Sequence, residues 1–419
     1  MDECEELRLG DIAQIVMGQS PPGESCNLVG EGTPLLNGPT EFGPRHPTPV
    51  QFTTDVRKRA QKGDLLFCVR GSTTGRMNWA DQEYAIGRGI AAIRHKRSKH
   101  LQPFVRAAIE SQLAGLLQAA TGSTFPNVAA AQLADIPIPD IDGETQSALA
   151  SVLGALDDKI DLNRRMNETL EGMARAIFKD WFVDFGPVRA KAEGRQPPGL
   201  APDIAALFPD KLDDDDKPMG WARGTLGSIA TVNPESWSAA SCPESVDYVD
   251  LANTKWGMIE STVHYDWDKA PSRARRILRS GDTIIGTVRP GNGSFAPIGR
   301  EGLTGSTGFA VLRPKQPHFR EILYYAATSP ENIERLSHLA DGAAYPAVRP
   351  EIVAATELII ASEAIATIFF QLTAPYMDRV EANKQENRTL SALRDLLLLK
   401  LMSGEVRLKE GSSFAQGAA

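Results

Sequence analysis

The chain contains an internal repeat, and this duplication constrains its fold more than any other feature. Short segments of the first half return in the same order about 220 residues later. The matched pairs include Leu9-Gly10-Asp11-Ile12-Ala13 with Leu226-Gly227-Ser228-Ile229-Ala230, Gly63-Asp64-Leu65-Leu66 with Gly281-Asp282-Thr283-Ile284, Gly89–Arg94 with Gly308–Arg313, and Gly122–Val128 with Gly342–Val348. Two similar modules in fixed relation are typical of a protein whose target also has two parts.

Each repeat begins with a module rich in glycine, proline and short apolar runs, in residues 1–145 and 221–360. The runs Leu65–Val69 and Thr283–Val288 are bounded by glycine-containing turns, which is typical of buried strands. Residues 103–118 and 319–338 predict helices. The sequence therefore predicts an α/β (mixed) fold with two similar globular domains.

Each repeat ends in a long helix, and we expect a central spacer helix over 146–185 and a C-terminal spacer helix over 361–405. Apolar residues recur at the a and d heptad positions, here called the seam. The first seam is Leu149, Leu153, Leu156, Ile160, Asn163, Asn167, Leu170, Ala174, Ile177 and Trp181. The counterpart is Phe369, Thr373, Tyr376, Val380, Asn383, Asn387, Leu390, Arg394, Leu397 and Leu401. Arg394 breaks the second seam, and Pro375 predicts that the helix begins or kinks there.

Both seams carry an asparagine pair at equivalent positions, Asn163 with Asn167 and Asn383 with Asn387. An apolar stripe on one helix is usually only a core face. Polar seam residues weaken a coiled coil but select its register and partner. The pairs therefore favour a coiled coil between the two helices. If the helices are antiparallel, we expect the pairs to hydrogen-bond across the seam.

Residues 186–220 are rich in proline and include the acidic run Asp213–Asp216. Such a run could be a protease site or a metal cluster, but in a proline-bounded segment it is more typical of a solvated linker. The composition of residues 406–419 predicts a flexible tail.

The composition argues against several classes of protein. No apolar run is long enough to span a membrane, and the acidic N-terminus lacks a signal core, so we expect a cytoplasmic protein. The four cysteines and six histidines show no metal-ligand spacing. The net charge of −8 is mildly unfavourable for nucleic-acid binding, yet basic clusters recur just before both Gly-Asp segments. These are Arg57-Lys58-Arg59 with Lys62, and Arg273, Arg275, Arg276 and Arg279.

The chain lacks a recognisable catalytic or cofactor motif. No P-loop occurs, and Gly291-Asn292-Gly293 lacks the third glycine of a dinucleotide loop. Asn233-Pro234 and Pro209-Asp210 are only fragments of methyltransferase and nuclease motifs. We therefore expect a chain that catalyses nothing by itself, with an independent enzyme as a minor alternative.

Two glycine-rich loops at equivalent places carry polar residues suited to DNA. Arg70–Arg76 follows the first buried strand, and Arg289–Ser294 follows the second. Arginine can bind guanine, asparagine can bind adenine, and hydroxyls can hold phosphates. An ordinary tight turn would also need these glycines. The candidate DNA-binding residues are Arg57, Lys58, Arg70, Ser72, Thr73, Thr74, Arg76, Arg88, Arg273, Arg275, Arg276, Arg289, Asn292 and Ser294.

This organisation resembles the DNA-specificity subunit of type I restriction–modification enzymes, and the resemblance covers nearly the whole chain. The residues that carry it are Ile136-Pro137-Ile138-Pro139, Gln146, Leu156-Asp157-Asp158-Lys159-Ile160, Asn163, Asn167-Glu168-Thr169-Leu170, Phe178–Phe185, Leu226-Gly227 and Lys400–Gly404. The opening Leu9-Gly10-Asp11 and the segment Gly63-Asp64-Leu65-Leu66 also look typical of that family.

The resemblance implies a binding subunit with two target recognition domains, each reading one half of an asymmetric, bipartite DNA site. It implies that the antiparallel helices set the gap between the half-sites and dock two modification (methyltransferase) subunits, which restriction (motor nuclease) subunits then join. S-adenosylmethionine, ATP and Mg²⁺ would belong to those partners, with no cofactor in this chain. The alternative is a duplicated coiled-coil scaffold that binds proteins or glycans.

Overall fold

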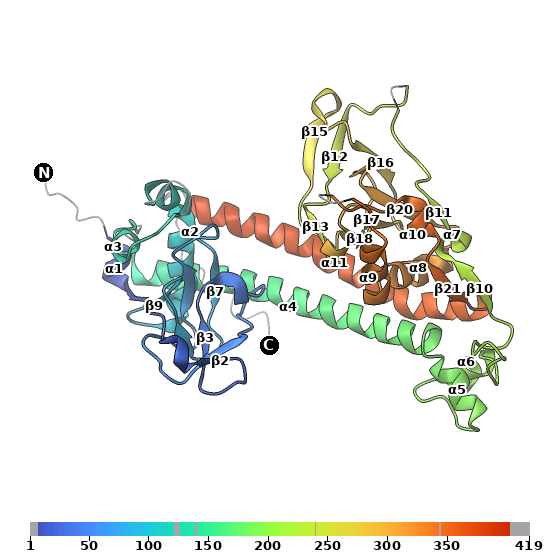
Figure 1. The fold of residues 1–419 in the computed structure, drawn as a ribbon. Coiled ribbons are helices and arrows are strands. Elements are labelled where there is room, and N and C mark those ends of the chain that lie inside the picture. Colours follow the sequence, from blue (N-terminus) through green and yellow to red (C-terminus); the bar gives the residue numbers. More distant parts are fainter. Residues whose placement is uncertain (1–6, 121–125, 139–140, 239, 343–344, 403–419) are drawn as a thin grey trace, which may run out of the picture. The chain divides into compact units, whose positions relative to one another are not determined.

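The computed structural model describes residues 7–120, 126–138, 141–238, 240–342 and 345–402. The chain divides into two units, the first made of Met1–Arg164 and Lys384–Ala419 and the second of Arg165–Asn383. Each unit contains a sheet-rich domain and one stretch of each of two long helices, α4 (Gly143–Phe182) and α11 (Glu363–Met402) (Figure 1). The expected mixed α/β fold is confirmed.

The first unit contains two sheets. One has the strand order β1-β9-β6-β7, built from β1 (Ala13–Met17), β6 (Leu65–Cys68), β7 (Met77–Trp79) and β9 (Ile90–His95). The other has the order β2-β4-β3-β8-β5, built from β2 (Cys26–Asn27), β3 (Thr33–Leu36), β4 (Gln51–Thr53), β5 (Arg59–Ala60) and β8 (Tyr84–Ile86). Within the second sheet, β3 and β8 pair in parallel.

The second unit repeats this topology. One sheet has the order β11-β20-β17-β18, built from β11 (Ala230–Val232), β17 (Thr283–Gly286), β18 (Phe295–Pro297) and β20 (Phe309–Pro314). The other has the order β15-β12-β19-β16, built from β12 (Ser245–Val249), β15 (Val263–Asp266), β16 (Ala274–Leu278) and β19 (Leu303–Ser306). Here β12 and β19 form the parallel pair. The repeat in the sequence is therefore a repeat in topology.

The two domains differ in small additions to this shared frame. The first has the extra edge strand β2, and the second has a hairpin of β13 (Thr254–Lys255) and β14 (Met258–Ile259). A further two-stranded sheet joins β10 (Ala222–Thr225) to β21 (Glu357–Ile360). Among the described residues of the first domain, an isolated bridge between Arg8 and Pro137 lies at the same place. These differences lie at the edge of the shared sheets or outside them, so each domain can vary there without losing its core.

Buried strands form the cores, as their apolar runs predict. All four residues of β6 and all four of β17 are buried. Short helices complete the domains: α1 (Leu9–Ile12), α2 (Gln102–Ala119) and α3 (Ala130–Ala134) in the first, and α7 (Leu226–Ile229), α8 (Arg320–Ala327), α9 (Pro330–His338) and α10 (Pro350–Ala354) in the second.

The helix predicted over 319–338 is wrong as a single element, because it divides into α8 and α9. Pro330 disfavours the helical conformation of the residue before it. Ser329 instead caps α9, and its side chain accepts a hydrogen bond of 3.1 Å from the Asn332 N–H.

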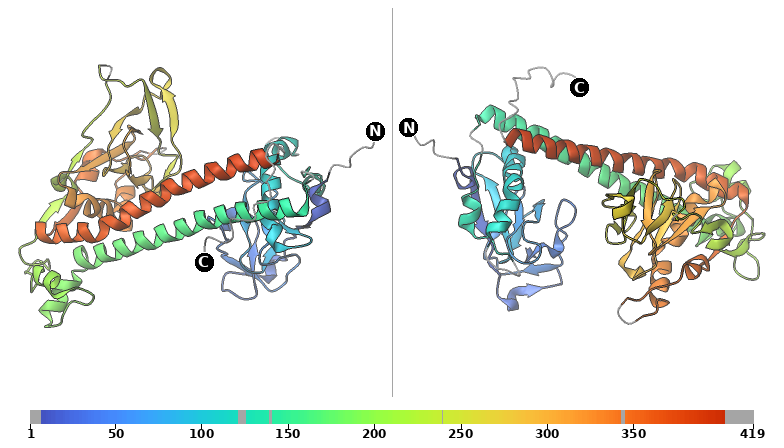
Figure 2. Two further views of the ribbon diagram at one scale, coloured as in Figure 1. Left: turned by 180° about the vertical axis from the view of Figure 1, so that it is seen from behind. Right: turned by 90° about the horizontal axis from the view of Figure 1, so that it is seen from above.

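The helices α4 and α11 lie side by side and antiparallel within each unit (Figure 2). In the first unit, Asp157 contacts Arg394 and Asn163 contacts Asn387, so residue numbers rise along one helix as they fall along the other. In the second unit, Asn167 contacts Asn383 and Trp181 contacts Phe369. Asp142 caps the start of α4, where its carboxylate accepts a 2.8 Å hydrogen bond from the Thr145 N–H.

The seam asparagines pair between the helices. In the first unit, Asn163 Nδ2 donates to Asn387 Oδ1 at 2.9 Å, and Asn387 Nδ2 donates to the Ile160 carbonyl at 3.3 Å. In the second unit, Asn383 Nδ2 donates to Asn167 Oδ1 at 2.8 Å. The same side-chain contact thus occurs in both units with the roles of the helices exchanged. If one helix were shifted along the other by one heptad, these amides would be buried without partners. Other registers are therefore disfavoured.

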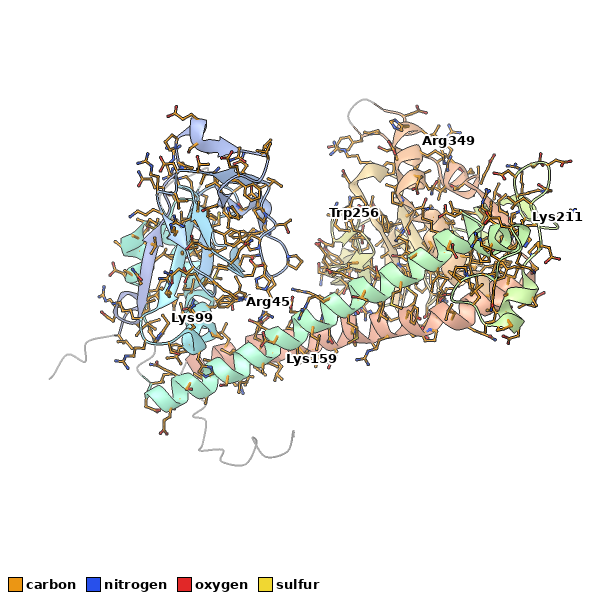
Figure 3. The ribbon with its side chains drawn as sticks, turned by 90° about the horizontal axis from the view of Figure 1, so that it is seen from below. Arg45, Lys99, Lys159, Lys211, Trp256 and Arg349 are labelled. Carbon is orange, nitrogen blue, oxygen red and sulfur yellow. The ribbon has the colours of Figure 1, made fainter. Side chains whose placement is uncertain are left out.

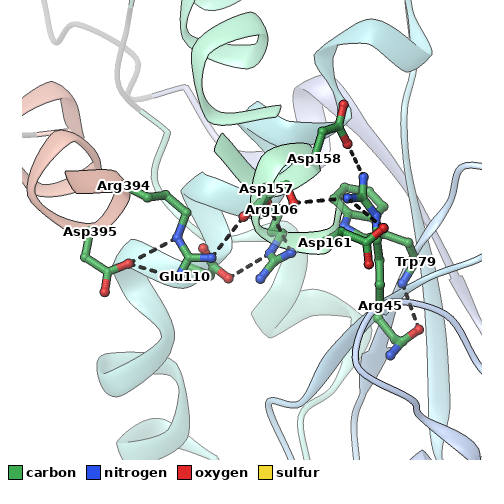
Figure 4. A network of polar contacts seen from close by, with 10 residues as sticks. Arg45, Trp79, Arg106, Glu110, Asp157, Asp158, Asp161, Arg394 and Asp395 are labelled. Atoms are coloured by element: carbon green, nitrogen blue, oxygen red, sulfur yellow. Dashed lines mark hydrogen bonds and ion pairs between the residues drawn. The ribbon is translucent and has the colours of Figure 1, made fainter. Parts of the chain in front are cut away.

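The charged residue in the second seam, Arg394, is compensated rather than disruptive. Its guanidinium donates at 3.0 Å to Asp157 Oδ1 of α4, and Arg106 of α2 donates to the other oxygen of that carboxylate at 3.3 Å (Figure 4). Arg45 donates to the Asp157 carbonyl at 3.1 Å and pairs with Asp158. Asp157 therefore joins the first domain to both helices of its unit.

Of the two alternatives that Pro375 predicted, a start or a kink, a helix start at that residue is wrong. The second helix begins at Glu363 and includes Pro375 in its interior. Proline cannot donate a hydrogen bond to the carbonyl one turn earlier, so packing must outweigh this loss. Phe369 and Thr373, on the turns just before it, are fully buried in the second unit.

The segment expected to be a linker, 186–220, contains two short helices, α5 (Gly186–Ala192) and α6 (Pro202–Leu207). Phe208, which follows α6, is buried against Trp181 with its ring at 5.1 Å. The expected flexible tail, 406–419, lies outside the described residues. Within those residues, no helix has the length and apolar character that a membrane span requires.

Candidate nucleic-acid interface

The repeated Gly-Asp segments form a buried ion pair in each domain. The side chain of Asp64 is 1% exposed, and Arg94 donates to its two oxygens at 2.6 Å each. Arg313 likewise donates hydrogen bonds to the two oxygens of Asp282, at 2.8 and 2.9 Å. These bonds hold the start of β6 to β9 and the start of β17 to β20. The hydrogen bonds that Arg94 donates to Asp64 also raise the pKa of Arg94. The segments are therefore structural, and the pair in the first domain lies at the ends of β6 and β9 away from Arg70 and Arg88.

Several residues of the basic clusters are neutralised within the domain. Arg59 pairs with Glu83, and Arg279 donates to Glu235 at 3.1 Å. Hydrogen bonds from Arg279 and Arg313 lower the pKa of Glu235 to about 2, so this carboxylate stays ionised at neutral pH. Clustered arginine and lysine residues in the sequence therefore do not by themselves show that the surface is positively charged.

An open polar cleft of about 660 Å³ lies in the first domain, where the carboxyl ends of β3 and β6 meet the turn between β8 and β9. Its polar side chains are Ser20, Asn37, Gln51, Arg70 and Arg88. Arg70 and Arg88 were expected from the sequence to bind DNA, and the cleft brings them together although they belong to different loops.

The cleft also contains an amide pair that the sequence did not single out. Asn37 Nδ2 donates to Gln51 Oε1 at 3.0 Å, and the Arg88 N–H donates to Ser20 Oγ at 3.3 Å. Arginine reads guanine, and asparagine or glutamine reads adenine, through paired hydrogen bonds in the major groove. The signal available in the sequence was a polar residue, Asn37, directly after the apolar pair Leu35-Leu36.

Of the other candidates in the first domain, some are exposed and others form hydrogen bonds within the domain. Ser72 and Thr73 are exposed on the loop after β6. Thr74 Oγ1 donates to the carbonyls of Gly71 and Pro126, at 2.7 and 2.9 Å, so its hydroxyl shapes the loop. Arg76 donates to the Pro39 and Phe42 carbonyls at 3.5 Å.

Two further candidates, Arg57 and Lys58, are exposed beside β5. Arg57 pairs with Asp55 at 2.6 Å, across a surface where both side chains remain more than two-fifths exposed. A surface pair of this kind is weak and exchanges readily with solvent. Arg57 can therefore exchange its carboxylate for a phosphate at little cost.

The candidate loop of the second domain, Arg289–Ser294, has a different form. Arg289 adopts the left-handed backbone conformation (φ 47°), and its guanidinium lies 4.8 Å above the Tyr345 ring. A 3-10 helix, Pro290–Asn292, follows and leaves Asn292 exposed. Ser294 is buried, and its hydroxyl donates to the Leu251 carbonyl at 3.0 Å. Ser294 therefore supports the loop and is not available to DNA.

The position equivalent to Asn37 carries Asp250, since each residue follows the first strand of the parallel pair. Arg273 donates to Asp250 at 2.7 Å and to the Tyr248 hydroxyl at 2.9 Å. The two domains thus present different hydrogen-bonding groups at equivalent places, an amide pair in the first and an acid–arginine pair in the second.

The two remaining candidate arginines of the second domain, Arg275 and Arg276, contact residues of their own domain. The Arg275 guanidinium lies 4.8 Å above the Trp267 ring, and Arg276 donates to Ser236 Oγ at 3.2 Å. Burial lowers the pKa of Arg276. In the described part of the chain, no group of three or more His, Cys, Asp or Glu side chains is placed to hold a metal ion.

Comparisons with known proteins point to one family. Residues 1–172 match the type I restriction modification DNA specificity domain. The chain is 23% identical to the Type I restriction enzyme HindI specificity subunit of Haemophilus influenzae, over 97% of this chain and all of that one. It is 34% identical to the putative type I restriction enzyme MjaX specificity subunit of Methanocaldococcus jannaschii, over 45% of this chain and 44% of that one.

The fold is also similar to that of a solved structure, the S subunit of a type I restriction-modification system from M. genitalium. The TM-score is 0.58 at 16% sequence identity, covering 95% of each chain. The similarity to specificity subunits that the motifs indicated is confirmed by these matches.

Proposed function

We propose that this chain, whose relatives are type I restriction–modification specificity subunits, is the DNA-specificity subunit of such an enzyme. It recognises DNA, and each of its two domains reads one half of a bipartite site. The observation that supports this function is that the two domains share one sheet topology but expose different polar residues at equivalent places. The first domain presents Asn37, Gln51, Arg70 and Arg88, whereas the second presents Arg289, Asn292 and the Asp250–Arg273 pair.

In this proposal the antiparallel helices set the gap between the half-sites and dock two methyltransferase subunits, which the restriction subunits join. The asparagine pairs support the first role because they select a single register, and a single register gives a single gap. S-adenosylmethionine, ATP and Mg²⁺ would act in the partner subunits, and this chain would position the reaction in the cytoplasm without catalysing it. The alternative of a scaffold for proteins or glycans has no support among the relatives.

Exchanging one module tests the function directly. Residues 1–142, which end just before α4, would be replaced by the equivalent residues of a relative with a different target, and the full complex expressed in a host. Methylation-sensitive sequencing should show one changed half-site, with the other half-site and the gap unchanged, because each domain has its own core. A change in both half-sites, or no methylated motif with either chain, would refute modular reading of DNA.

Single arginine substitutions should act on one half-site each. We expect Arg70→Ala and Arg289→Ala each to weaken binding to the target by about 1–3 kcal/mol and to relax the preference at one base pair. Binding of the complex to duplexes with each base pair varied in turn measures both effects. Arg97→Ala, which removes an exposed arginine outside the cleft, is the matched control. An unchanged preference in the Arg70 variant would mean that Arg70 only supports its loop.

A further inference from the structure

Trp256 is the feature of the second domain that neither the core nor the reading residues explain. It lies between β13 and β14, and 62% of it is exposed on the surface of the second unit (Figure 3). Burying an aromatic residue of this size is strongly favourable, so an exposed one forgoes a large stabilisation. The hairpin that carries it has no counterpart in the first domain, where the 3-10 helix Pro39–Glu41 follows Asn37.

The exposed indole is held firmly in place. The backbone N–H of Trp256 donates to the Gly293 carbonyl at 2.7 Å, and the backbone N–H of Gly257 donates to the Phe295 carbonyl at 2.9 Å. The indole also packs edge-on against the Phe295 ring, with centroids 5.7 Å apart. Two backbone hydrogen bonds thus fix the turn that carries Trp256, and one ring contact fixes the indole itself. Its exposed face is therefore preorganised.

The backbone at Trp256 is strained to achieve this position. Its φ is 47°, in the left-handed region that bulky residues rarely adopt. Such strain persists where the surrounding structure imposes it, and it is concentrated at binding and catalytic sites. Gly293 contributes to the arrangement, because a Cβ at that position would collide with the indole.

Trp256 is continuous with the candidate loop of the second domain. Gly293, on which the indole lies, ends the 3-10 helix that begins after Arg289 and exposes Asn292. At the other end of this loop, Arg289 is stacked on Tyr345, which is 72% exposed. We call these four residues the aromatic ridge: Trp256, Asn292, Arg289 and Tyr345. The ridge places a DNA-reading pair between two exposed aromatic rings.

We propose that Trp256 stacks on the bases of the half-site that the second domain reads, inserting beside a partly unstacked base step. The inference rests on the proposed function and adds an apolar contact to it. Aromatic rings stack on any base, and apolar wedges are a common means of unstacking and bending a duplex. Arg289 and Asn292 would supply the sequence preference, while Trp256 would favour steps that are easily unstacked.

The test uses the complex of the full chain with its methyltransferase subunit and a duplex that contains the methylated motif. Alanine substitution of a base-stacking aromatic residue weakens binding by roughly 5- to 100-fold, so Trp256→Ala should do so, and Trp256→Phe should retain most of the affinity. The slope of log affinity against log salt should stay unchanged, because no charge is removed. Arg289→Ala, in contrast, removes a positive charge from the interface and should make the dependence of affinity on salt shallower.

Two controls separate the possible outcomes. Met219→Ala removes another exposed apolar residue of the second unit, in the connector before β10, and should leave affinity unchanged. Thermal unfolding of Trp256→Ala shows whether the loss of the Phe295 contact alone lowers stability. Normal affinity in a folded Trp256→Ala variant would overturn the stacking proposal. Failure to assemble with the methyltransferase subunit would also overturn it and assign Trp256 to a protein contact. Absence of specific binding by the unmodified complex would refute the proposed function instead.

Discussion

Replacing Asp64 with alanine is expected to lower the free energy of unfolding of the first domain by about 3–5 kcal/mol, because it leaves Arg94 without its partner in the core. Both oxygens of Asp64 accept hydrogen bonds from Arg94, and one also accepts from the Gln61 N–H at 2.7 Å. Among the residues that the structure describes, no second carboxylate pairs with Arg94. The variant therefore loses the pair and leaves a partly buried positive charge.

The equivalent substitution in the second domain should have a smaller effect. Arg313 keeps a second carboxylate, Glu235, after Asp282→Ala. Denaturant unfolding combined with hydrogen exchange would measure both variants, since exchange in β6 and β9 reports on the first domain and exchange in β17 and β20 on the second. Asp55→Ala, which breaks an exposed ion pair of the first domain, is the control and should change stability by less than about 1 kcal/mol. An Asp64→Ala variant as stable as this control would contradict the structural role of the repeated segment.

The second large effect is expected at the aromatic cluster that joins the long helices in the second unit. Phe369 of α11 is fully buried, with its ring centroid at 5.0 Å from Phe182, 5.9 Å from Trp181 and 6.2 Å from Phe178. Phe369→Ala should lower the free energy of unfolding by about 3–5 kcal/mol, through lost apolar contact and the cavity left behind. Urea unfolding of the second unit, followed by tryptophan fluorescence, measures this loss because Trp181 and Trp221 lie in the cluster.

The neighbouring Phe370 provides a matched control on the same helix. It is only partly buried and lies beneath the Arg320 guanidinium at 5.4 Å. Phe370→Ala should therefore cost less than half as much as Phe369→Ala. Equal effects of the two substitutions would show that burial in the helix pair is not the source of stability. Weakened pairing should also broaden the range of gaps that the complex methylates, if the helices set that distance.

Features that depend on local periodicity were predictable from the sequence. The repeat predicted two domains of one topology, and the heptad spacing predicted two long paired helices, because period and burial are linked residue by residue. The asparagine pairs were informative for the same reason. They recur at one seam position in each helix, and only an antiparallel pairing lets Asn163 meet Asn387 and Asn167 meet Asn383.

The candidate reading residues were less predictable, because a sequence does not show which neighbours neutralise a charge or bury a hydroxyl. Arg70 and Arg88 were named as candidates from the sequence, but Asn37 and Gln51 became candidates only when the sheet placed them in the same cleft. Ser294 looked equivalent to the hydroxyls of the first loop, yet it is buried and the Leu251 carbonyl accepts its hydrogen bond. Contacts with residues distant in the sequence thus decide which polar side chains face outward.

The sequence by itself determined the duplication, the strands of the two cores and the paired helices with their register, since each follows from a pattern within one element. Only the tertiary structure decided how α11 continues through Pro375, and why Arg394 is acceptable in the seam. The packing of Phe369 outweighs a missing backbone hydrogen bond in the first case, and the carboxylate of Asp157 compensates the charge in the second. The surfaces that distinguish the two domains were also decided only by the tertiary structure, because contacts between loops that are distant in the sequence determine which hydrogen-bonding groups are exposed.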